Sequence, residues 1–155
     1  MPRWSIIVIG LLIVIDQAVK HWMLALLFDP PRVLEVTGFF NLVPVWNFGI
    51  SFGLFGNSSA SRWILVGLAL VIVVVLLVWL RRAGTGVVVF ALVLVVGGAL
   101  SNVVDRVLYG AVIDFVDIHG FGFHWPAFNI ADMSIVIGTA LLLYDGLFGP
   151  QRAIK

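Results

Sequence analysis

Three carboxylates stand close together in a chain that is otherwise strongly apolar. Asp114, Asp117 and Asp132 lie within the stretch VIDFVDIHGFGFHWPAFNIAD, residues 112–132. Two carboxyl groups that share one proton can hydrolyse an amide: the ionised one takes a proton from the attacking water, and the protonated one donates to the carbonyl oxygen. Such a pair needs two separate segments and a partly dry site. Asp114, in the loop before the last apolar run, and Asp132, at the start of that run, meet this description.

Two other acids compete for membership of the pair. Asp105 is followed directly by Arg106 and could be occupied by an ion pair, and Asp117 lies only three residues after Asp114. Spacing alone does not choose among these acids.

A serine or cysteine nucleophile fits the chain less well. The sequence has no cysteine, which excludes a thiol nucleophile, disulfides and thiolate zinc sites. A serine–lysine pair would combine Lys20 with Ser51 or Ser101. Asp16, one helical turn from Lys20, makes that lysine a poor general base.

Metal and nucleic-acid chemistry find little support. His119 and His124 are five residues apart in a glycine-rich stretch and match no familiar zinc pattern. The net charge of +1 comes without a basic run. We therefore expect no metal, no cofactor and no nucleic-acid partner.

The composition indicates a lipid bilayer as the solvent. The 155 residues are 62% hydrophobic and 11% charged, with a mean hydropathy of +1.16, whereas soluble domains carry about 25% charged residues. A helix crosses the hydrocarbon with about 20 residues, and four runs suffice: approximately 4–28, 62–80, 87–107 and 130–148. The first run is too long for a signal peptide and lacks a small-residue cleavage site. We predict an all-α polytopic membrane protein, a single domain over residues 1–155, with four transmembrane helices and a small extracytoplasmic β-like segment.

Lysine and arginine placement predicts the orientation. The segments that flank the runs on one side carry Arg3, Arg81, Arg82, Arg152 and Lys155. Both termini are therefore expected in the cytoplasm, with segments 29–61 and 108–129 outside it.

In segment 29–61, short runs of Val, Thr, Phe and Trp are broken by Gly and Pro, which favours a β-like structure at the membrane interface. In the alternative interpretation NFGISFGLF is an amphipathic re-entrant piece, with Asn47 and Gly49 as turn residues.

Polar residues of three runs are expected at one depth, in the outer half of the membrane. Asp16 and Lys20 are four apart and share a helix face, as do Asn102 and Arg106. Ionisable groups in a span usually face a cavity or the bundle interior, so an ion pair or a functional site is expected here. Nearby small residues, Gly97, Gly98, Ala99 and Ser101, allow a second helix to approach closely.

Two functions other than hydrolysis remain open on residues alone. A small transporter or proton and cation relay would use the buried acids, but the cytoplasmic half of the spans has a single acid, Asp145. A non-catalytic membrane chaperone would explain the aromatic segment but not the paired acids.

Five motifs together resemble one known family. DQAVK (16–20), NFGISFG (47–53), GGALSNVVDR (97–106), VIDF (112–115) and PAFNIAD (126–132) are similar, in order and spacing, to lipoprotein signal peptidase, or signal peptidase II. The resemblance implies an aspartic endopeptidase of the bacterial cytoplasmic (inner) membrane. Its substrates are prolipoproteins whose lipobox cysteine carries a diacylglyceryl group, and it cuts on the N-terminal side of that cysteine.

The resemblance also implies roles for single residues. It makes Asp114 and Asp132 the catalytic pair. The substrate-binding residues that it implies are Asp16, Lys20, Asn47, Gly49, Asn102, Asp105, Arg106 and Asn129. Ser101 is the clearest departure, because the family usually has glycine there. We further expect residues 39–55 to cover the substrate groove, and the protein to work as a monomer whose partners are its prolipoprotein substrates and membrane lipid.

Overall fold

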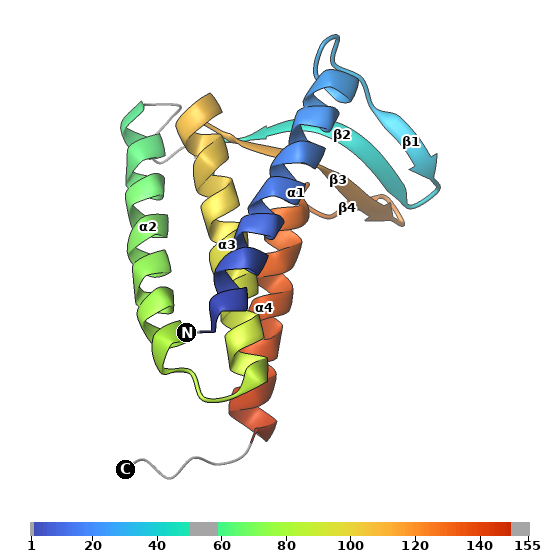
Figure 1. Cartoon of the computed structure of the whole chain (residues 1–155). Coiled ribbons are helices and arrows are strands. Elements are labelled where there is room, and N and C mark those ends of the chain that lie inside the picture. The colour runs from blue at the N-terminus through green and yellow to red at the C-terminus, as the bar shows by residue number, and fades with distance from the viewer. Residues whose placement is uncertain (1, 50–58, 150–155) are drawn as a thin grey trace.

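Four long helices run alongside one another, with a small sheet across one end (Figure 1). The structure is a computed structural model that describes residues 2–49 and 59–149, without the side chains of residues 59 and 60. The helices are α1 (Arg3–Leu27), α2 (Ser59–Arg82), α3 (Gly86–Tyr109) and α4 (Ile130–Phe148). Each is long and apolar enough to cross a membrane, α2 over Ser61–Arg82. The four predicted spans are confirmed to within a few residues.

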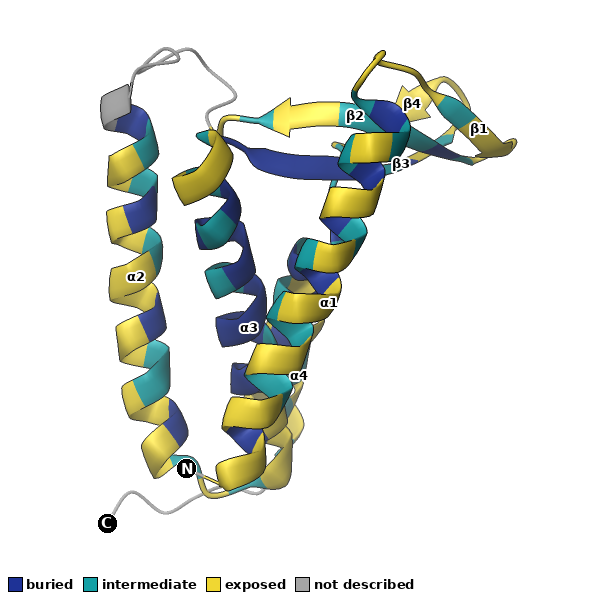
Figure 2. Ribbon diagram, turned by 45° about the horizontal axis from the view of Figure 1, so that its top comes forward, coloured by how far each residue is buried: buried dark blue, intermediate teal, exposed yellow. Residues whose placement is uncertain are grey.

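Helix α3 is the centre of the bundle and packs against each of the other three helices. Most of its length is buried, whereas α1 and α2 are largely exposed (Figure 2). The exposed residues of α1, α2 and α4 include many large apolar side chains. Apolar side chains exposed all along α2 agree with the lipid-facing scaffold expected of that span.

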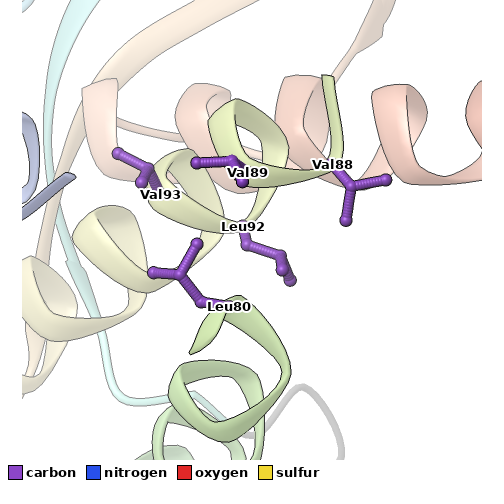
Figure 3. Packing of buried hydrophobic residues seen from close by; sticks show 5 residues of the cluster. All are labelled: Leu80, Val88, Val89, Leu92 and Val93. Carbon is purple, nitrogen blue, oxygen red and sulfur yellow. The ribbon is translucent and has the colours of Figure 1, made fainter. Parts of the chain in front are cut away.

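The end of the bundle away from the sheet is closed by a small apolar cluster. Leu80 of α2 packs there with Val88, Val89, Leu92 and Val93 of α3 (Figure 3). Helix α3 begins just before this cluster, where the Thr85 side chain accepts a hydrogen bond from the backbone N–H of Val88. The α2–α3 connection is therefore held both by the cap at the N-terminus of α3 and by the apolar cluster beside it.

The sheet has four antiparallel strands in the order β1-β2-β3-β4. They are β1 (Leu34–Thr37), β2 (Phe40–Asn47), β3 (Val112–Gly120) and β4 (Phe123–His124). The β-like structure predicted in segment 29–61 is confirmed by β1 and β2. The prediction that Asp114 lies in a loop was wrong, because residues 112–120 form the longest strand. Their β-branched and aromatic residues favour a buried strand, and the glycines that suggested a loop come only at its end.

Two glycines allow α3 and α4 to approach at backbone distance. A Cβ added at Gly98 would overlap the carbonyl oxygen of Ala131 and lie 2.9 Å from Cγ1 of Ile135. A Cβ added at Gly138 of α4 would lie 2.6 Å from the carbonyl oxygen of Ala91. Small residues serve this purpose in membrane bundles, and the prediction of close approach at Gly98 is confirmed.

We predict that Gly98→Ala lowers the free energy of unfolding by about 1–3 kcal/mol, the usual cost of overpacking. The added methyl group has to push the first turn of α4 away from α3. Gly67→Ala is the control, since Gly67 lies on the exposed side of α2 with no atom within 4 Å of the added Cβ. Thermal or denaturant unfolding in detergent micelles measures both. Equal stability of the two variants would contradict the predicted contact.

Candidate active site

A fully buried ion cluster joins α1 to α3 at the level just below the sheet. The Nζ atom of Lys20 lies 2.7 Å from Oδ2 of Asp16 and 2.6 Å from Oδ2 of Asp105, and it donates to Oδ1 of Asn102 at 2.9 Å. The predicted Asp16–Lys20 pair is confirmed. Asp105 pairs with Lys20, and within the described ranges no ion pair joins Arg106 to an acid.

Ser101 and Gln17 complete this cluster through contacts that the sequence did not predict. The Ser101 hydroxyl donates to Oδ2 of Asp16 at 2.6 Å. The Gln17 amide donates to Oδ1 of Asp105 at 2.6 Å and to the Ser101 hydroxyl oxygen at 3.2 Å. Ser101, where the resemblance implies glycine, therefore adds a hydrogen-bond donor to the cluster. A glutamine in a span is itself a signal of such a contact.

The N-terminus of α4 is tied to the same cluster. Asn129 caps the helix by accepting from the backbone N–H of Asp132 at 2.9 Å, and the Asp132 carboxylate accepts from the backbone N–H of Asn129 at 3.3 Å. The backbone N–H of Ala131, in the first turn of α4, has no partner within the helix and donates to Oδ1 of Asp16 at 2.9 Å. This capping box satisfies groups that a helix start leaves open, and it fixes the Asp132 side chain.

Strand β3 brings the second acid to this helix start. Phe128 and Val116 exchange backbone hydrogen bonds of 3.1 and 2.9 Å, which hold the segment before α4 against β3. Asn129 follows directly, and its side-chain amide donates to Oδ1 of Asp114 at 2.7 Å. Asn129 thus contacts the Asp114 carboxylate through its side chain and the Asp132 carboxylate through its backbone N–H.

Each of the two acids receives a second amide from another element. Asn47 of β2 donates to Oδ2 of Asp114 at 2.8 Å, and Asn102 of α3 donates to Oδ1 of Asp132 at 2.7 Å. Burial raises the pKa of Asp114 to about 6, the hydrogen bonds from Asn47 and Asn129 oppose the rise, and the negative charge of Asp132 adds to it. A carboxyl group whose pKa lies well above its usual range, beside a second carboxyl group, is suited to share a proton with it.

Gly49 and Arg106 border the two acids on the side of β2. Gly49 has φ +85°, and its N–H donates to Oδ1 of Asn47 at 2.8 Å. A Cβ there would lie 2.6 Å from Leu65 and 3.4 Å from the Arg106 guanidinium. Nε of Arg106 is buried and has no partner among the residues that the structure describes.

The predicted cover over the substrate groove, residues 39–55, lies partly outside the described residues. The same is true of residues 50–53 of the motif NFGISFG.

Asp117 belongs to a separate contact near the far end of β3. It accepts hydrogen bonds from Asn41 at 3.0 Å and from Nδ1 of His124 at 2.9 Å, and the His119 ring stacks on that of His124. Burial raises the pKa of Asp117, but these hydrogen bonds outweigh it and hold the pKa below its usual value. Of the three acids in residues 112–132, Asp114 and Asp132 contact Asn129, whereas Asp117 contacts Asn41 and His124.

The geometry does not favour a metal site or a serine–lysine nucleophile among the described residues. Across residues 2–49 and 59–149, no group of three or more His, Asp or Glu side chains is arranged to hold a metal ion. Lys20 is surrounded by three acceptors and Ser101 donates to Asp16, so the two do not form a nucleophile–base pair. Ser51 lies outside the described residues.

Comparison with known proteins gives one family. The family described as signal peptidase (SPase) II matches residues 8–148. The chain is 46% identical over 142 residues to a lipoprotein signal peptidase of Methylobacterium sp. (strain 4-46), covering 90% of this chain and 86% of that protein. It is 41% identical over 154 residues to one of Rhodopseudomonas palustris (strain TIE-1), covering 95% and 93%.

Solved structures agree with these sequence matches. A bacterial membrane enzyme solved by the in meso method at 1.9 Å superposes with a TM-score of 0.79 at 28% identity, covering 94% of each chain. A second such structure, at 2.3 Å, gives a TM-score of 0.76 at 28% identity, covering 97% of this chain and 94% of that one. The arrangement of helices and sheet is therefore that of a known membrane enzyme.

We predict that Lys20→Met destabilises the protein by about 3–5 kcal/mol, because it leaves Asp16 and Asp105 buried without a cation. The double variant Lys20→Met/Asp105→Asn removes one of the stranded charges and should recover part of the loss, a coupling that a double-mutant cycle measures. Unfolding in detergent reports both. Additive losses in the double variant would contradict the ion cluster.

Proposed function

The chain belongs to the signal peptidase II family of membrane aspartic peptidases, and on this basis we propose that it removes the signal peptide from diacylglyceryl-modified prolipoproteins. Cleavage falls on the N-terminal side of the lipidated cysteine. The relatives named lipoprotein signal peptidase, each covered over most of its length, support this substrate class. One chain carries both acids and their partners, so a monomer suffices for the reaction.

The reaction is a direct attack of water on the scissile carbonyl carbon. The ionised carboxylate of the Asp114–Asp132 pair takes a proton from the water, and the protonated partner donates its proton to the carbonyl oxygen. Collapse of the tetrahedral intermediate breaks the C–N bond, and the cysteine nitrogen leaves with the proton that the pair took from the water. The signal peptide is released as a carboxylic acid. The observation that carries this proposal is the contact of Asn129 with both acids.

The remaining polar residues position the pair and the substrate. Asn47 and Asn102 each donate to one acid and fix its orientation. Arg106, whose partly buried guanidinium lies beside Gly49, is a candidate to hold a substrate carbonyl oxygen. Lys20, Asp16 and Asp105 act through Asn102 and the α4 N-terminus, and so serve as positioning residues rather than catalytic ones.

The orientation in the bacterial inner membrane completes the proposal. With Arg81 and Arg82 at the cytoplasmic ends of α2 and α3, both termini lie in the cytoplasm. The sheet and the two acids then lie toward the extracytoplasmic face. A scissile bond next to a lipidated cysteine lies at that depth.

We predict that Asp114→Asn and Asp132→Asn each lower the rate of signal-peptide release by at least about 100-fold, because each removes one of the two proton-transfer groups. The purified protein is incubated with a diacylglyceryl-modified prolipoprotein and release is followed by gel shift.

Asp117→Asn is the matched control, since Asp117 lies on the same strand as Asp114 and also accepts from an asparagine of β2. It should cleave at a rate close to that of the parent. Parent-like cleavage by Asp114→Asn or Asp132→Asn would refute the assignment of the pair.

The pH dependence should move when Asn47 is replaced. The Asn47 N–H stabilises the ionised form of Asp114, so Asn47→Leu raises the pKa of Asp114 further above its value of about 6. Ionisation then needs a higher pH, and the profile of kcat/KM should shift upward in pH.

Asn41→Leu removes the equivalent hydrogen bond to Asp117 and should leave the profile in place. If the pH profile of kcat/KM is the same for Asn47→Leu and the parent, ionisation of Asp114 does not control activity, and the prediction is wrong.

A cysteine at Gly120 tests the orientation. The chain has no cysteine of its own, Gly120 is exposed at the end of β3, and nothing lies within 4 Å of an added Cβ. Gly120→Cys in whole cells should react with a membrane-impermeant thiol reagent added outside the inner membrane. Gly86→Cys, equally open at the α2–α3 connection, should react only after the membrane is broken. The reverse pattern would invert the proposed topology.

A further inference from the structure

An open apolar groove of about 480 Å³ lies directly beside Asp132. One wall is the segment that precedes α4, and the other is the first two turns of α4 itself. Its lining residues are Trp125, Pro126, Ala127, Phe128, Asp132, Met133, Val136 and Ile137. The volume is in the range of about 300–1,000 Å³ that is usual for small-ligand sites, and Asp132 is the one charged residue of this lining.

The groove exists because the two walls are held apart by different partners. The segment before α4 is bonded to β3: the Trp125 N–H donates to the carbonyl oxygen of Ile118 at 2.8 Å, and Phe128 exchanges hydrogen bonds with Val116. Helix α4 instead begins directly after its cap residue Asn129, leaves the sheet and packs against α3. The segment therefore cannot fold down onto the outer face of α4, and the angle between them stays open.

The helix side of the groove continues as a lipid-facing surface. Met133, Val136 and Ile137 are spaced for one helix face and are 45%, 66% and 49% exposed. In a spanning helix such side chains face hydrocarbon. The groove thus connects the candidate acid at one end with the bilayer interior at the other.

We propose that this groove holds an acyl chain of the substrate's diacylglyceryl group during cleavage. The inference rests on the proposed function. The lipid is attached to the residue that follows the scissile bond, so its first atoms lie within a few bonds of the carbonyl carbon that is attacked and therefore close to Asp132. An acyl chain that starts there needs an apolar path into the hydrocarbon, and Met133, Val136 and Ile137 supply it.

An acyl chain fits this lining better than a stretch of peptide. Apart from Asp132 and the indole N–H of Trp125, the lining side chains offer no strong hydrogen-bonding group. A peptide in the groove would leave backbone N–H and C=O groups without side-chain partners at membrane depth, which is costly. The hydrocarbon chain has no such groups.

Filling the groove tests the proposal. Val136→Trp places an indole in it, and Leu143→Trp is the control, since Leu143 is 62% exposed on the same helix but does not line the groove. Both variants and the parent are assayed on prolipoprotein substrates that differ only in having long or short acyl chains.

Val136→Trp should lose at least about tenfold in kcat/KM on the long-chain substrate, mainly through KM, because even one methylene in a hydrophobic pocket is worth about 10–200-fold. It should keep its rate on the short-chain substrate, and Leu143→Trp should keep both. Parent-like kinetics of Val136→Trp on both substrates, or an equal loss on both, would overturn the proposal.

A second measurement locates the chain without relying on turnover. A substrate with a photoactivatable group in its acyl chain is crosslinked to the inactive Asp114→Asn variant, and the adducts are mapped by mass spectrometry. Adducts within residues 125–137 are expected. Adducts confined to other spans, or adducts in 125–137 only from a probe on the signal peptide, would refute acyl-chain binding. Failure of the proposed function has a different signature, because the parent would then cleave none of the substrates.

Discussion

A lysine ammonium buried at membrane depth has to be neutralised by acids that are buried with it, and in this chain the acids come from two helices. Lys20 and Asp16 belong to α1, and Asp105 belongs to α3, with all three side chains fully buried. Breaking such a contact leaves an uncompensated charge in a medium of low dielectric constant. The depth and rotation of α1 relative to α3 are therefore set by this cluster. Oδ1 of Asp16 extends the constraint to α4 by accepting the N–H of Ala131.

Asparagine side chains carry this constraint to the two candidate catalytic acids. The Asn102 amide accepts from Lys20 and donates to Asp132, so the ion cluster and the acid share one side chain. Asn129 then links Asp132 to Asp114 on β3. An amide suits this position because it donates and accepts at once and carries no charge that would compete with the proton of the pair. The sheet is needed because only β3 can bring Asp114 to the first turn of α4.

The sequence predicts the framework better than the details of the site. The length of the apolar runs was enough to predict the four helices. The four-residue spacing of Asp16 and Lys20 was enough to predict their ion pair. The partner of Asp105 could not be read from the sequence, because its neighbour Arg106 suggested a local pair while the fold offers Lys20 from another helix. The contacts of Ser101 and Gln17 depend on the rotation of α1 against α3. The groove beside Asp132 depends on the angle between a strand-bound segment and a helix, which leaves no signal in residue spacing.

Coupled titration of Asp114 and Asp132 is the measurement closest to the central claim, that these two acids share a proton. Isotope-labelled aspartate carboxyl groups can be followed by infrared or NMR spectroscopy across a pH range centred on about 6, the value to which burial raises the pKa of Asp114. Proton sharing predicts two separated steps in the parent, each seen at both acids, and a single step in Asp114→Asn and in Asp132→Asn. Two acids that each titrate in one independent step in the parent would contradict it.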